Sequence, residues 1–424
     1  MARLLYSILF YLLLPLVLLR LAYRALKAPD YRHRVAERFG FFRSSPPPGG
    51  LWVHAVSVGE TIAAAPLIRH YLQQHPDLPV TVTTMTPTGS ERVRALFGNR
   101  VFHVYAPYDT PDSIRRFLRR IRPRAAVIME TEVWPNMVCQ TVASGVPVVL
   151  ANARLSAKSA AGYQRAGALS KPVMRAFYRI VAQHQADARR FAELGVEPHA
   201  LRVSGSIKFD LTLEEAQRRS ARELRQSLGS DRPVWIAAST HEGEDELLLA
   251  AHRKLLTQRP EALLILVPRH PERFDSVARL IENQAMSYLR RSASTGDTGS
   301  IQVLLGDTMG ELLVLLGCAD VAFIGGSLVP HGGHNSLEAA AWGLPILTGH
   351  SDFNFADISQ RLEEAGALIK TDAQEIGAVL TSLLANQGKR ESMGSAALAV
   401  MEGNRGALAT LIAEIDAALA SGAE

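Results

Sequence analysis

The sequence predicts an α/β protein with two domains, each built on a parallel sheet that helices cover on both faces. Its 424 residues exceed the usual length of a single domain. From Leu51 onward, short apolar runs alternate with helical segments, a pattern typical of parallel sheets. The alternation weakens between Ile207 and Asp231 and starts again at Val234, which indicates a boundary between two domains.

The first domain is expected to cover residues 51–210. Helical segments such as Ile62–Gln74, Asp112–Ile121 and Trp134–Ala143 separate its apolar runs. Strands are expected at Leu51–Val56, Val80–Thr84, Val101–Tyr105, Ala125–Met129, Val146–Ala151, Ile180–Gln183 and Leu201–Gly205.

Residues 211–232 are expected to connect the domains through a charged helix, Leu213–Leu228, and the second domain is expected to cover residues 233–400. Its helices include Glu244–Leu256, Met309–Cys318 and Asn335–Trp342, and Arg290–Ser300 is expected to be an exposed loop. Strands are expected at Val234–Ala238, Leu263–Val267, Val303–Leu305, Ala319–Gly325, Pro345–Thr348 and Ala367–Ile369.

The last segment, residues 401–424, contains a predicted helix, Gly406–Leu419, which would return to the first domain. Two α/β domains of similar size are expected to face each other across a cleft, and clefts of this kind bind ligands.

Residues 1–23 are predicted to be a membrane anchor. Leu4–Leu19 is apolar apart from Ser7, but it is short for a spanning helix of about 20 residues and contains Pro15. No small-residue cleavage site follows it, and most of the nearby positive charge lies after it, which argues against a signal peptide. That charge places the rest of the chain in the cytoplasm. A single-pass anchor and an interfacial helix in one leaflet both fit the pattern.

The positive charge of the chain is concentrated near its N-terminus. Residues 1–43 contain eight Lys or Arg side chains and two acidic ones, whereas the whole chain has a net charge of +5. This location indicates contact with inner-membrane lipids, and no nucleic-acid partner is expected.

Residues 24–50 are interpreted as a basic juxtamembrane segment and linker. Within them, Asp30–Gly40 is expected to form a solvated helix, or to meet the phosphates of an anionic lipid through Arg32, Arg34 and Arg38. A second basic group is expected to form a solvated helix face, with membrane contact as the alternative; it consists of Arg115, Arg116, Arg119, Arg120, Arg122 and Arg124.

Metal and disulfide chemistry are not indicated. The two cysteines, Cys139 and Cys318, lie far apart in apolar segments, which fits a reducing compartment. His241 and His270 do not have the spacing of a metal site, so neither a metal nor a cofactor is expected.

Polar residues that follow parallel strands are candidates for a site, because ligands gather at the carboxyl ends of such strands. In the first domain, Glu60 follows a strand and the tight turn at Gly59, and it begins a helix whose N-terminus would favour the ionised carboxylate. It is a candidate general base, although a Glu at this position also commonly stabilises a helix. Glu130 and Glu132 follow another strand, and Lys208 follows the last, where it would neutralise phosphate charge or pair with Glu130.

In the second domain, Arg269 directly follows a strand, which suits a phosphate clamp. Met309–Glu311 opens a helix, where backbone groups can bind the edge of a nucleobase. The stretch Ile324–Pro345 predicts a strand, a glycine-rich turn and a helix whose first turn carries Asn335 and Glu338. Such a turn allows a phosphate to approach the backbone, and Glu338 can accept hydrogen bonds from a ribose diol.

Six motifs together resemble the bacterial 3-deoxy-D-manno-octulosonic acid (Kdo) transferases that act on lipid A. The resemblance covers nearly the whole chain, and the occurrence of all six in this order makes it specific. The motifs are His54–Glu60, Thr86–Gly89, Met129–Pro135, Gly205–Asp210, Val267–Pro271 and Gly332–Ala340.

The resemblance implies a GT-B glycosyltransferase with two Rossmann-like domains, the first binding the acceptor and the second the donor CMP-Kdo. The acceptor would be the lipid A precursor, lipid IVA, at the bacterial inner membrane during lipopolysaccharide biosynthesis. By motif, Glu60 is the general base of an inverting transfer, and Glu130 and Lys208 stabilise the transition state. The implied CMP contacts are Pro268, Arg269, Met309, Gly310, Glu311, Asn335, Ser336, Leu337 and Glu338.

Two other classes of function fit parts of the same pattern. Another membrane-associated GT-B enzyme, using a UDP-sugar, would share the glycine-rich turn but would not require the motifs around Glu130 and Lys208. A membrane-anchored nucleotide-binding protein without catalysis would also share that turn. Loss of turnover in a Glu60→Ala protein that still binds CMP would exclude this class.

Overall fold

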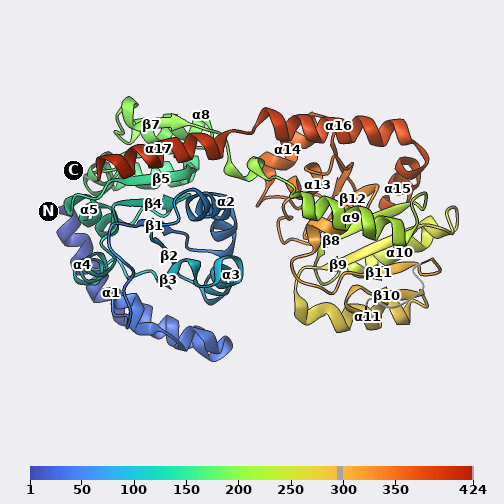
Figure 1. Cartoon of the computed structure of the whole chain (residues 1–424), viewed down its shortest axis with the longest axis horizontal. Helices are drawn as coiled ribbons and strands as arrows, with labels where there is room; N and C mark the ends of the chain where they lie inside the picture. Colours follow the sequence, from blue (N-terminus) through green and yellow to red (C-terminus); the bar gives the residue numbers. More distant parts are fainter. Residues whose placement is uncertain (294–298, 423–424) are drawn as a thin grey trace. The chain divides into compact units, whose positions relative to one another are not determined.

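The computed structural model describes residues 1–293 and 299–422 and divides the chain into two compact units. Met1–Lys208 and Arg405–Glu424 form the first unit, and Phe209–Asn404 forms the second (Figure 1). Each unit contains a parallel sheet covered by helices, which confirms the predicted fold class. Residues 294–298 of the expected loop and residues 423–424 of the C-terminal segment lie outside the described residues.

A seven-stranded sheet with the order β3-β2-β1-β4-β5-β6-β7 forms the centre of the first unit. Strands β1, β2, β4 and β5 are buried at every residue, because helices cover both faces of the sheet. The strands are β1 (Leu51–His54), β2 (Val80–Thr84), β3 (Phe102–Tyr105), β4 (Ala125–Met129), β5 (Val148–Ala153), β6 (Arg179–Ala182) and β7 (Leu201–Val203).

One face of this sheet packs against α2 (Val58–Gln74), α3 (Pro87–Phe97) and α17 (Ala407–Ser421). The other face packs against α4 (Pro111–Ile121), α5 (Pro135–Ala143), α6 (Ala157–Arg165), α7 (Gly167–Arg175) and α8 (Gln185–Glu193).

The C-terminal helix α17 belongs to the first unit and lies beside β5 and α2, shown in red in Figure 1. The hydroxyl of Tyr71 donates a hydrogen bond to Asp416 at 2.8 Å, and Arg179 pairs with Glu414 at 2.5 Å. Apolar residues of α17 such as Leu411 and Ile415 are also buried in the core on this face, so both polar and apolar contacts hold the helix there.

The N-terminal helix α1 (Ala2–Lys27) is long and apolar enough to cross a membrane, with a mean hydropathy of 2.2 over its most apolar window. It extends beyond the apolar run expected to form it and includes Pro15. Its N-terminal half packs against α5 and α7, and the amide nitrogen of Asn136 lies 3.0 Å from the hydroxyl of Ser7. Tyr11 also donates a hydrogen bond to Asp112 at the start of α4.

The segment expected to be a solvated helix consists of two short 3-10 turns, η1 (Pro29–Arg32) and η2 (Val35–Phe39), docked on the first unit. Arg38 is only 2% exposed; it donates to the carbonyl of Met85 at 3.0 Å and lies over the ring of Tyr105. Arg34 donates to the carbonyl of His103 at 2.9 Å. The expected solvated helix is therefore wrong, and the alternative contact with lipid phosphates is not available to Arg34 and Arg38, because both guanidinium groups bind protein groups.

The second unit contains a parallel sheet with the order β10-β11-β9-β8-β12-β13-β14. The expected charged helix is α9 (Glu215–Leu228), and it packs on this sheet through Ala221 and Leu228. The strands are β8 (Val234–Thr240), β9 (Leu263–Pro268), β10 (Tyr288–Arg290), β11 (Val303–Leu305), β12 (Val321–Ile324), β13 (Ile346–Thr348) and β14 (Leu368–Lys370). Strand β10 was not predicted, and it ends at Arg290, the first residue of the segment expected to be a loop.

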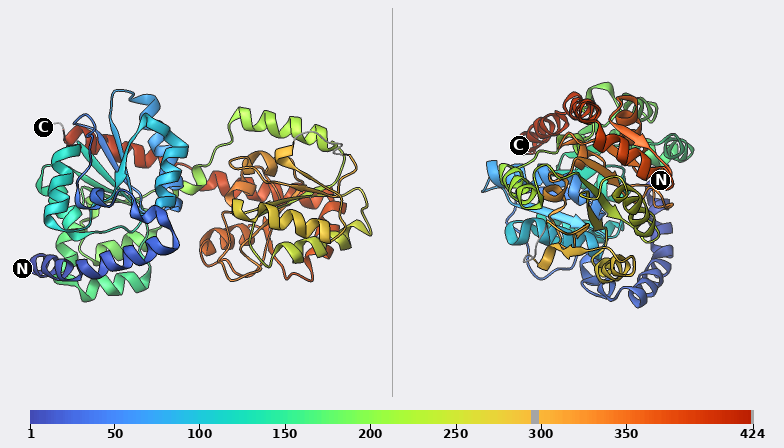
Figure 2. Two further views of the ribbon diagram at one scale, coloured as in Figure 1. Left: turned by 90° about the horizontal axis from the view of Figure 1, so that it is seen from below. Right: turned by 90° about the vertical axis from the view of Figure 1, so that its right-hand side faces the viewer.

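One face of the second sheet packs against α10 (Asp245–Leu256), α11 (Phe274–Asn283) and α15 (Ile376–Ala385). Figure 2 shows this layering from two further directions. The other face packs against α9 (Glu215–Leu228), α12 (Leu312–Leu316), α13 (Leu337–Ala340), α14 (Ala356–Glu364) and α16 (Gln387–Gly403).

Each sheet has a point where the strand order reverses. In the first unit β1 lies between β2 and β4, and in the second unit β8 lies between β9 and β12. Loops that leave the carboxyl ends of the two strands at such a point diverge to opposite faces, which opens a crevice for a ligand. Glu60 and Glu130 follow β1 and β4 at this point of the first sheet, and the glycine-rich turn follows β12 at that of the second.

Candidate active site

Glu60 lies at the reversal point of the first sheet, in the first turn of α2. The hydroxyl of Ser57 caps the helix by accepting from the backbone nitrogen of Glu60 at 3.3 Å, and it donates to Oε1 of Glu60 at 3.1 Å. Oε2 accepts from the backbone nitrogen of Val56 at 2.7 Å. These bonds fix the carboxylate at the end of β1, and each oxygen keeps a free lone pair for a substrate proton.

Burial raises the pKa of Glu60 from its ordinary value of 4.5 to about 7. The negative charges of Glu132 and Glu130 add to this effect and, with burial, outweigh the hydrogen bonds from Val56 and Ser57. The helix N-terminus was expected to favour the ionised form, but burial outweighs the groups that stabilise the charge. A carboxylate with a pKa near 7 can accept a proton efficiently at neutral pH.

Glu130 and Lys208 lie at the same edge of the sheet as Glu60. Glu130 follows β4, the neighbour of β1, and its backbone has a φ of +55°, which residues other than glycine rarely adopt. Lys208 lies in η5 (Ile207–Asp210) with its Nζ 3.7 Å from Oε1 of Glu130. The Asn152 side chain helps to hold η5, because its Oδ1 accepts from the nitrogen of Ile207 at 3.2 Å. The structure thus brings the three candidate catalytic residues together.

Glu132 is a fourth charged group of this site. Burial and the charge of Glu130 raise its pKa, and its Oε2 accepts from the indole nitrogen of Trp134 at 2.8 Å. Three carboxyl groups with a single partnered lysine make the site an acidic one, which suits proton acceptance.

In the second unit, a buried carboxylate orders the glycine-rich turn that follows β12. Glu244 is 0% exposed, and its oxygens accept from the backbone nitrogens of Gly326, Ser327 and Leu328 at 2.6, 3.0 and 2.9 Å. The same carboxylate accepts from the nitrogen of His241 at 2.9 Å. Sequence reasoning missed this role of Glu244, although the polar run that contains the residue directly follows a predicted strand.

Glycine is required where this turn approaches β8. A side chain on Gly325 would place its Cβ 2.6 Å from the carbonyl oxygen of Ser239. Gly326, Gly332 and Gly333 have positive φ angles, which glycine adopts without strain. The turn is therefore closely packed and follows a backbone path that residues with a side chain would adopt only with strain.

Histidines surround the turn. The Nε2 atoms of His241 and His334 lie 2.8 Å apart, and the ring of His331 stacks on that of His241 at 4.2 Å. Burial lowers the pKa of His241 to about 4 and that of His334 to about 3, and neighbouring cationic groups, including Arg269, add to both shifts. Both rings are thus neutral at pH 7, with one donating its proton to the other.

Arg269 directly follows β9, the strand beside β8. Within residues 1–293 and 299–422, its guanidinium forms neither an ion pair nor a side-chain hydrogen bond. It is therefore available to bind a phosphate group in the bidentate manner that arginine favours.

The structure places the remaining candidate donor residues on three loops of the second unit. Pro268 ends β9, and Met309 and Gly310 precede Glu311, which caps α12. Met309 is 61% exposed, whereas the Glu311 carboxylate accepts from Arg291 at 2.8 Å. Asn335, Ser336, Leu337 and Glu338 lie at the start of α13, where Ser336 and Leu337 are buried.

Helix α13 spans only Leu337–Ala340, so it is shorter than the predicted helix Asn335–Trp342. Asn335 precedes it and accepts from the nitrogen of Leu337 at 3.2 Å. A phosphate at this turn would thus depend on Arg269 more than on a helix dipole. Across the described residues, no group of three His, Cys, Asp or Glu side chains is arranged to hold a metal.

Comparison with known proteins identifies the family. Residues 33–211 match the model of the 3-deoxy-D-manno-octulosonic-acid transferases (kdotransferases), and residues 231–400 match that of the glycosyl transferases group 1. The chain is 45% identical to the 3-deoxy-D-manno-octulosonic acid transferase of Haemophilus influenzae over 97% of each chain. The chain belongs to the Kdo transferase family.

A second family member, from Bordetella pertussis, is 40% identical over 87% of each chain. Among solved structures, the UDP-GlcNAc 2-epimerase of Neisseria meningitidis is similar in fold, with a TM-score of 0.59 at 13% identity over 87% of this chain and all of that chain. These results confirm the predicted family and the GT-B type of fold. As a Kdo transferase, the protein is a glycosyltransferase, which excludes a binding protein without catalysis.

Proposed function

We propose that this Kdo transferase moves Kdo from CMP-Kdo to the lipid A precursor, lipid IVA, with inversion at the anomeric carbon. The observation that carries the proposal is the buried carboxylate of Glu60, whose pKa is about 7, beside the Glu130–Lys208 pair at one edge of the first sheet. The acceptor is assigned to the first domain and the donor to the second.

In the proposed reaction, Glu60 accepts the proton of an acceptor sugar hydroxyl. The oxygen of that hydroxyl forms a bond with the anomeric carbon of Kdo, while the bond from this carbon to the phosphate oxygen breaks and CMP leaves with the electron pair. Attack on the face opposite CMP inverts the configuration. A positioned carboxylate base contributes about 10²–10⁴-fold to such a step.

Lys208 and Glu130 act beside this base. The ammonium group of Lys208, 3.7 Å from Glu130, supplies positive charge to a site that otherwise holds three carboxyl groups. This charge would attract the anionic substrates and stabilise negative charge that develops during transfer.

The donor phosphate would be bound by Arg269, beside the glycine-rich turn. The free guanidinium of Arg269 supports this assignment. Glu338 would bind the ribose, and the loop Met309–Glu311 the cytosine. The guanidinium of Arg269 would thus neutralise negative charge on the phosphate of the leaving CMP.

The protein is proposed to act on the cytoplasmic side of the bacterial inner membrane, attached through α1 as a single-pass or interfacial anchor. The apolar character of α1 and the basic residues that follow it support this placement. A lipid acceptor requires such proximity to the bilayer.

The proposal is tested by incubating the purified protein with a tetra-acylated lipid A precursor and either CMP-Kdo or a panel of UDP-sugars. By mass spectrometry, we expect the lipid A precursor to gain the mass of one or more Kdo units when CMP-Kdo is the donor, and to gain no mass with any UDP-sugar. Folded protein that leaves CMP-Kdo intact but consumes a UDP-sugar would refute the donor assignment. Transfer of Kdo to another acceptor but not to the tetra-acylated precursor would refute the assignment of lipid IVA.

A further inference from the structure

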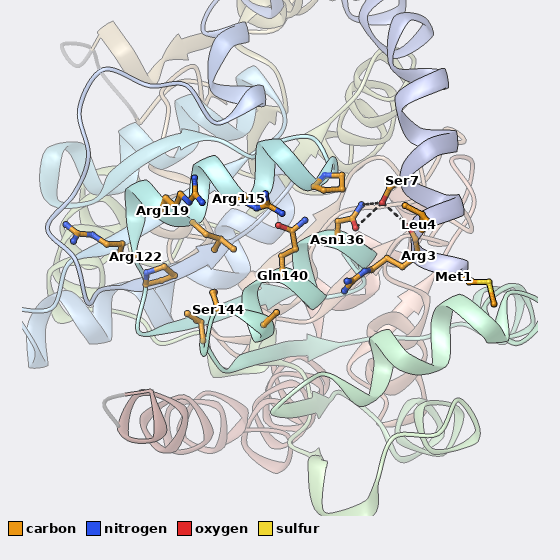
Figure 3. Close-up of a pocket in the computed structure, with 15 residues that line it drawn as sticks. Met1, Arg3, Leu4, Ser7, Arg115, Arg119, Arg122, Asn136, Gln140 and Ser144 are labelled. Atoms are coloured by element: carbon orange, nitrogen blue, oxygen red, sulfur yellow. Dashed lines mark hydrogen bonds between the residues drawn. The ribbon is translucent and has the colours of Figure 1, made fainter.

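A cavity of about 930 Å³ lies between α1, α4 and α5 of the first unit (Figure 3). Arg3 of α1, Arg115 and Arg119 of α4 and the following Arg122 line it, and Gln140 of α5 is also part of its wall. Arg115 and Arg119 lie four residues apart on one face of α4, and Arg122 is the residue that ends the helix.

The cavity is strongly cationic. None of its lining residues is acidic. Over the part of the chain that the structure describes, the guanidinium groups of Arg3, Arg115, Arg119 and Arg122 form no ion pair and donate no hydrogen bond to protein. Four unpartnered guanidinium groups around one hollow match an anion with several oxygen atoms, such as a phosphate group.

Other arginines of the same cluster are used within the protein. Arg116 pairs with Asp112 at 2.5 Å and donates to the carbonyl of Phe39, and the guanidinium of Arg120 lies over the ring of Phe42 at 4.5 Å. The six-arginine group is therefore not a uniform solvated face. It divides into arginines that stabilise the fold and arginines that line the cavity.

Apolar side chains lie directly beside this cationic cavity. Leu4 of α1 is part of its wall and is 64% exposed, and Leu5, Leu12 and Leu16 of the same helix are exposed by 67%, 70% and 60%. Cationic groups within a hollow and exposed leucines next to it match the two parts of an anionic lipid, the headgroup and the acyl chains.

We infer that this cavity binds the phosphate headgroup of an anionic membrane lipid while its acyl chains lie along the exposed leucines of α1. The bound lipid would hold the docked helix α1 at the membrane surface, parallel to one leaflet. The inference rests on the membrane attachment in the proposed function, and it adds a second lipid site to the acceptor site.

The part of this cavity around Arg122 and Pro123 is distinct from the candidate catalytic site. Pro123, which lines the cavity, precedes β4, whereas Glu130 follows this strand. The five residues of β4 span about 17 Å at about 3.3 Å per residue. Arg122 thus lies at the edge of the sheet opposite Glu130, and its substitution is not expected to affect transfer directly.

The test measures binding of the full-length protein to vesicles by flotation. Vesicles of phosphatidylcholine alone are compared with vesicles that also contain phosphatidylglycerol, and the ratio of the two partition coefficients gives the anionic preference. The cavity variant is Arg115→Gln with Arg119→Gln. The matched control is Arg94→Gln with Arg189→Gln, two exposed arginines of α3 and α8 that remove the same charge elsewhere on the unit.

We expect the anionic preference to fall roughly tenfold or more in the cavity variant, since each arginine near an anionic surface contributes to binding. The control pair is expected to change it by less than about twofold, because charges beyond about 10 Å from the surface are screened. A third variant, Ala143→Trp, fills part of the cavity without changing its charge. It is expected to reduce the preference as well.

Equal losses in the cavity and control variants, or no effect of Ala143→Trp, would overturn the inference in favour of general surface charge. Binding to both kinds of vesicle without an anionic preference would overturn it too, while leaving membrane attachment intact. Wild-type protein that binds neither vesicle would refute both the attachment and the inference. Transfer to detergent-dispersed precursor then tests the catalytic proposal separately.

Discussion

Substitution of Glu60 by glutamine is expected to reduce turnover by about 10²–10⁴-fold and yet stabilise the first domain above neutral pH. The pKa of Glu60 is about 7 in the folded protein, compared with an ordinary value of 4.5 that applies to the unfolded chain. Below pH 4.5 the carboxyl is protonated in both states, so its ionisation does not affect stability. Between pH 4.5 and about 7 the unfolded chain ionises while the folded carboxyl keeps its proton, so stability falls across this range, and above pH 7 the full cost of the buried charge remains.

The pKa difference corresponds to about 3 kcal/mol of destabilisation at pH 8 and to less than about 1 kcal/mol at pH 5. Glutamine would keep both hydrogen bonds, since its oxygen can accept from Val56 and its amide can donate to the Ser57 hydroxyl. Glu60→Gln is therefore expected to increase the free energy of unfolding by about 1–3 kcal/mol at pH 8.

Hydrogen exchange in increasing urea, read by mass spectrometry on peptides from β4 and β9, separates the two domains. In Glu60→Gln, the urea concentration at the unfolding midpoint of the β4 peptides is expected to rise at pH 8 and to change little at pH 5. The midpoint of the β9 peptides, which belong to the second domain, provides the internal control. A Glu60→Gln protein that is less stable at pH 8, or equally stabilised at both pH values, would refute the assignment of a buried carboxylate with a raised pKa.

Three further predictions concern the reaction. The kcat/KM is expected to fall about tenfold per pH unit below pH 7. Glu132→Gln should move the midpoint of this pH profile to lower pH, because it removes one negative charge that raises the pKa of Glu60. A midpoint at the wild-type pH would contradict this prediction. Lys208→Met should lower kcat by about 10²-fold with little change in the donor KM, measured by initial rates, and an unchanged kcat would remove Lys208 from the catalytic set. Arg269→Gln should weaken CMP binding by about 10–100-fold in calorimetry. A Kd like that of the wild type would exclude Arg269 from the donor site.

Buried strands were the most predictable part of the fold. The bounds of β2, β4 and β11 agree with the predicted ones. Each of these strands is a continuous buried run of three to five residues, which is too short for a typical helix. Strand β10 was missed, since it has three half-buried residues and borders a segment rich in Ser, Gly and Thr. Helix α13 is shorter than predicted, because the chain from Gly332 to Ser336 remains part of the turn.

The position of the candidate site could also be predicted in part. Glu60, Glu130 and Lys208 each follow a strand, and the parallel order of the sheet brings such positions to one edge. Their catalytic roles stay predictions. The sign of the Glu60 pKa shift could not be predicted, because it depends on burial and on Glu132, which is distant in sequence.

Contacts between distant segments account for the other differences. The docking of Arg38 on Tyr105 and Met85 depends on the assembled sheet, and a local basic pattern does not reveal it. The three backbone bonds from Gly326, Ser327 and Leu328 to Glu244 similarly require the turn after β12 to lie against the end of β8. In both cases the sequence shows the residue type but not its partners.

The most direct test of the account compares single-turnover Kdo transfer in the wild type, in Glu60→Gln and in Glu91→Gln. Glu91 is an exposed residue of α3 and provides the matched control for loss of one carboxylate. We expect Glu60→Gln to reduce the transfer rate by about 10²–10⁴-fold while CMP binds with unchanged affinity, and Glu91→Gln to behave as the wild type. Transfer by Glu60→Gln at the wild-type rate would show that another group accepts the proton, and it would contradict the central claim.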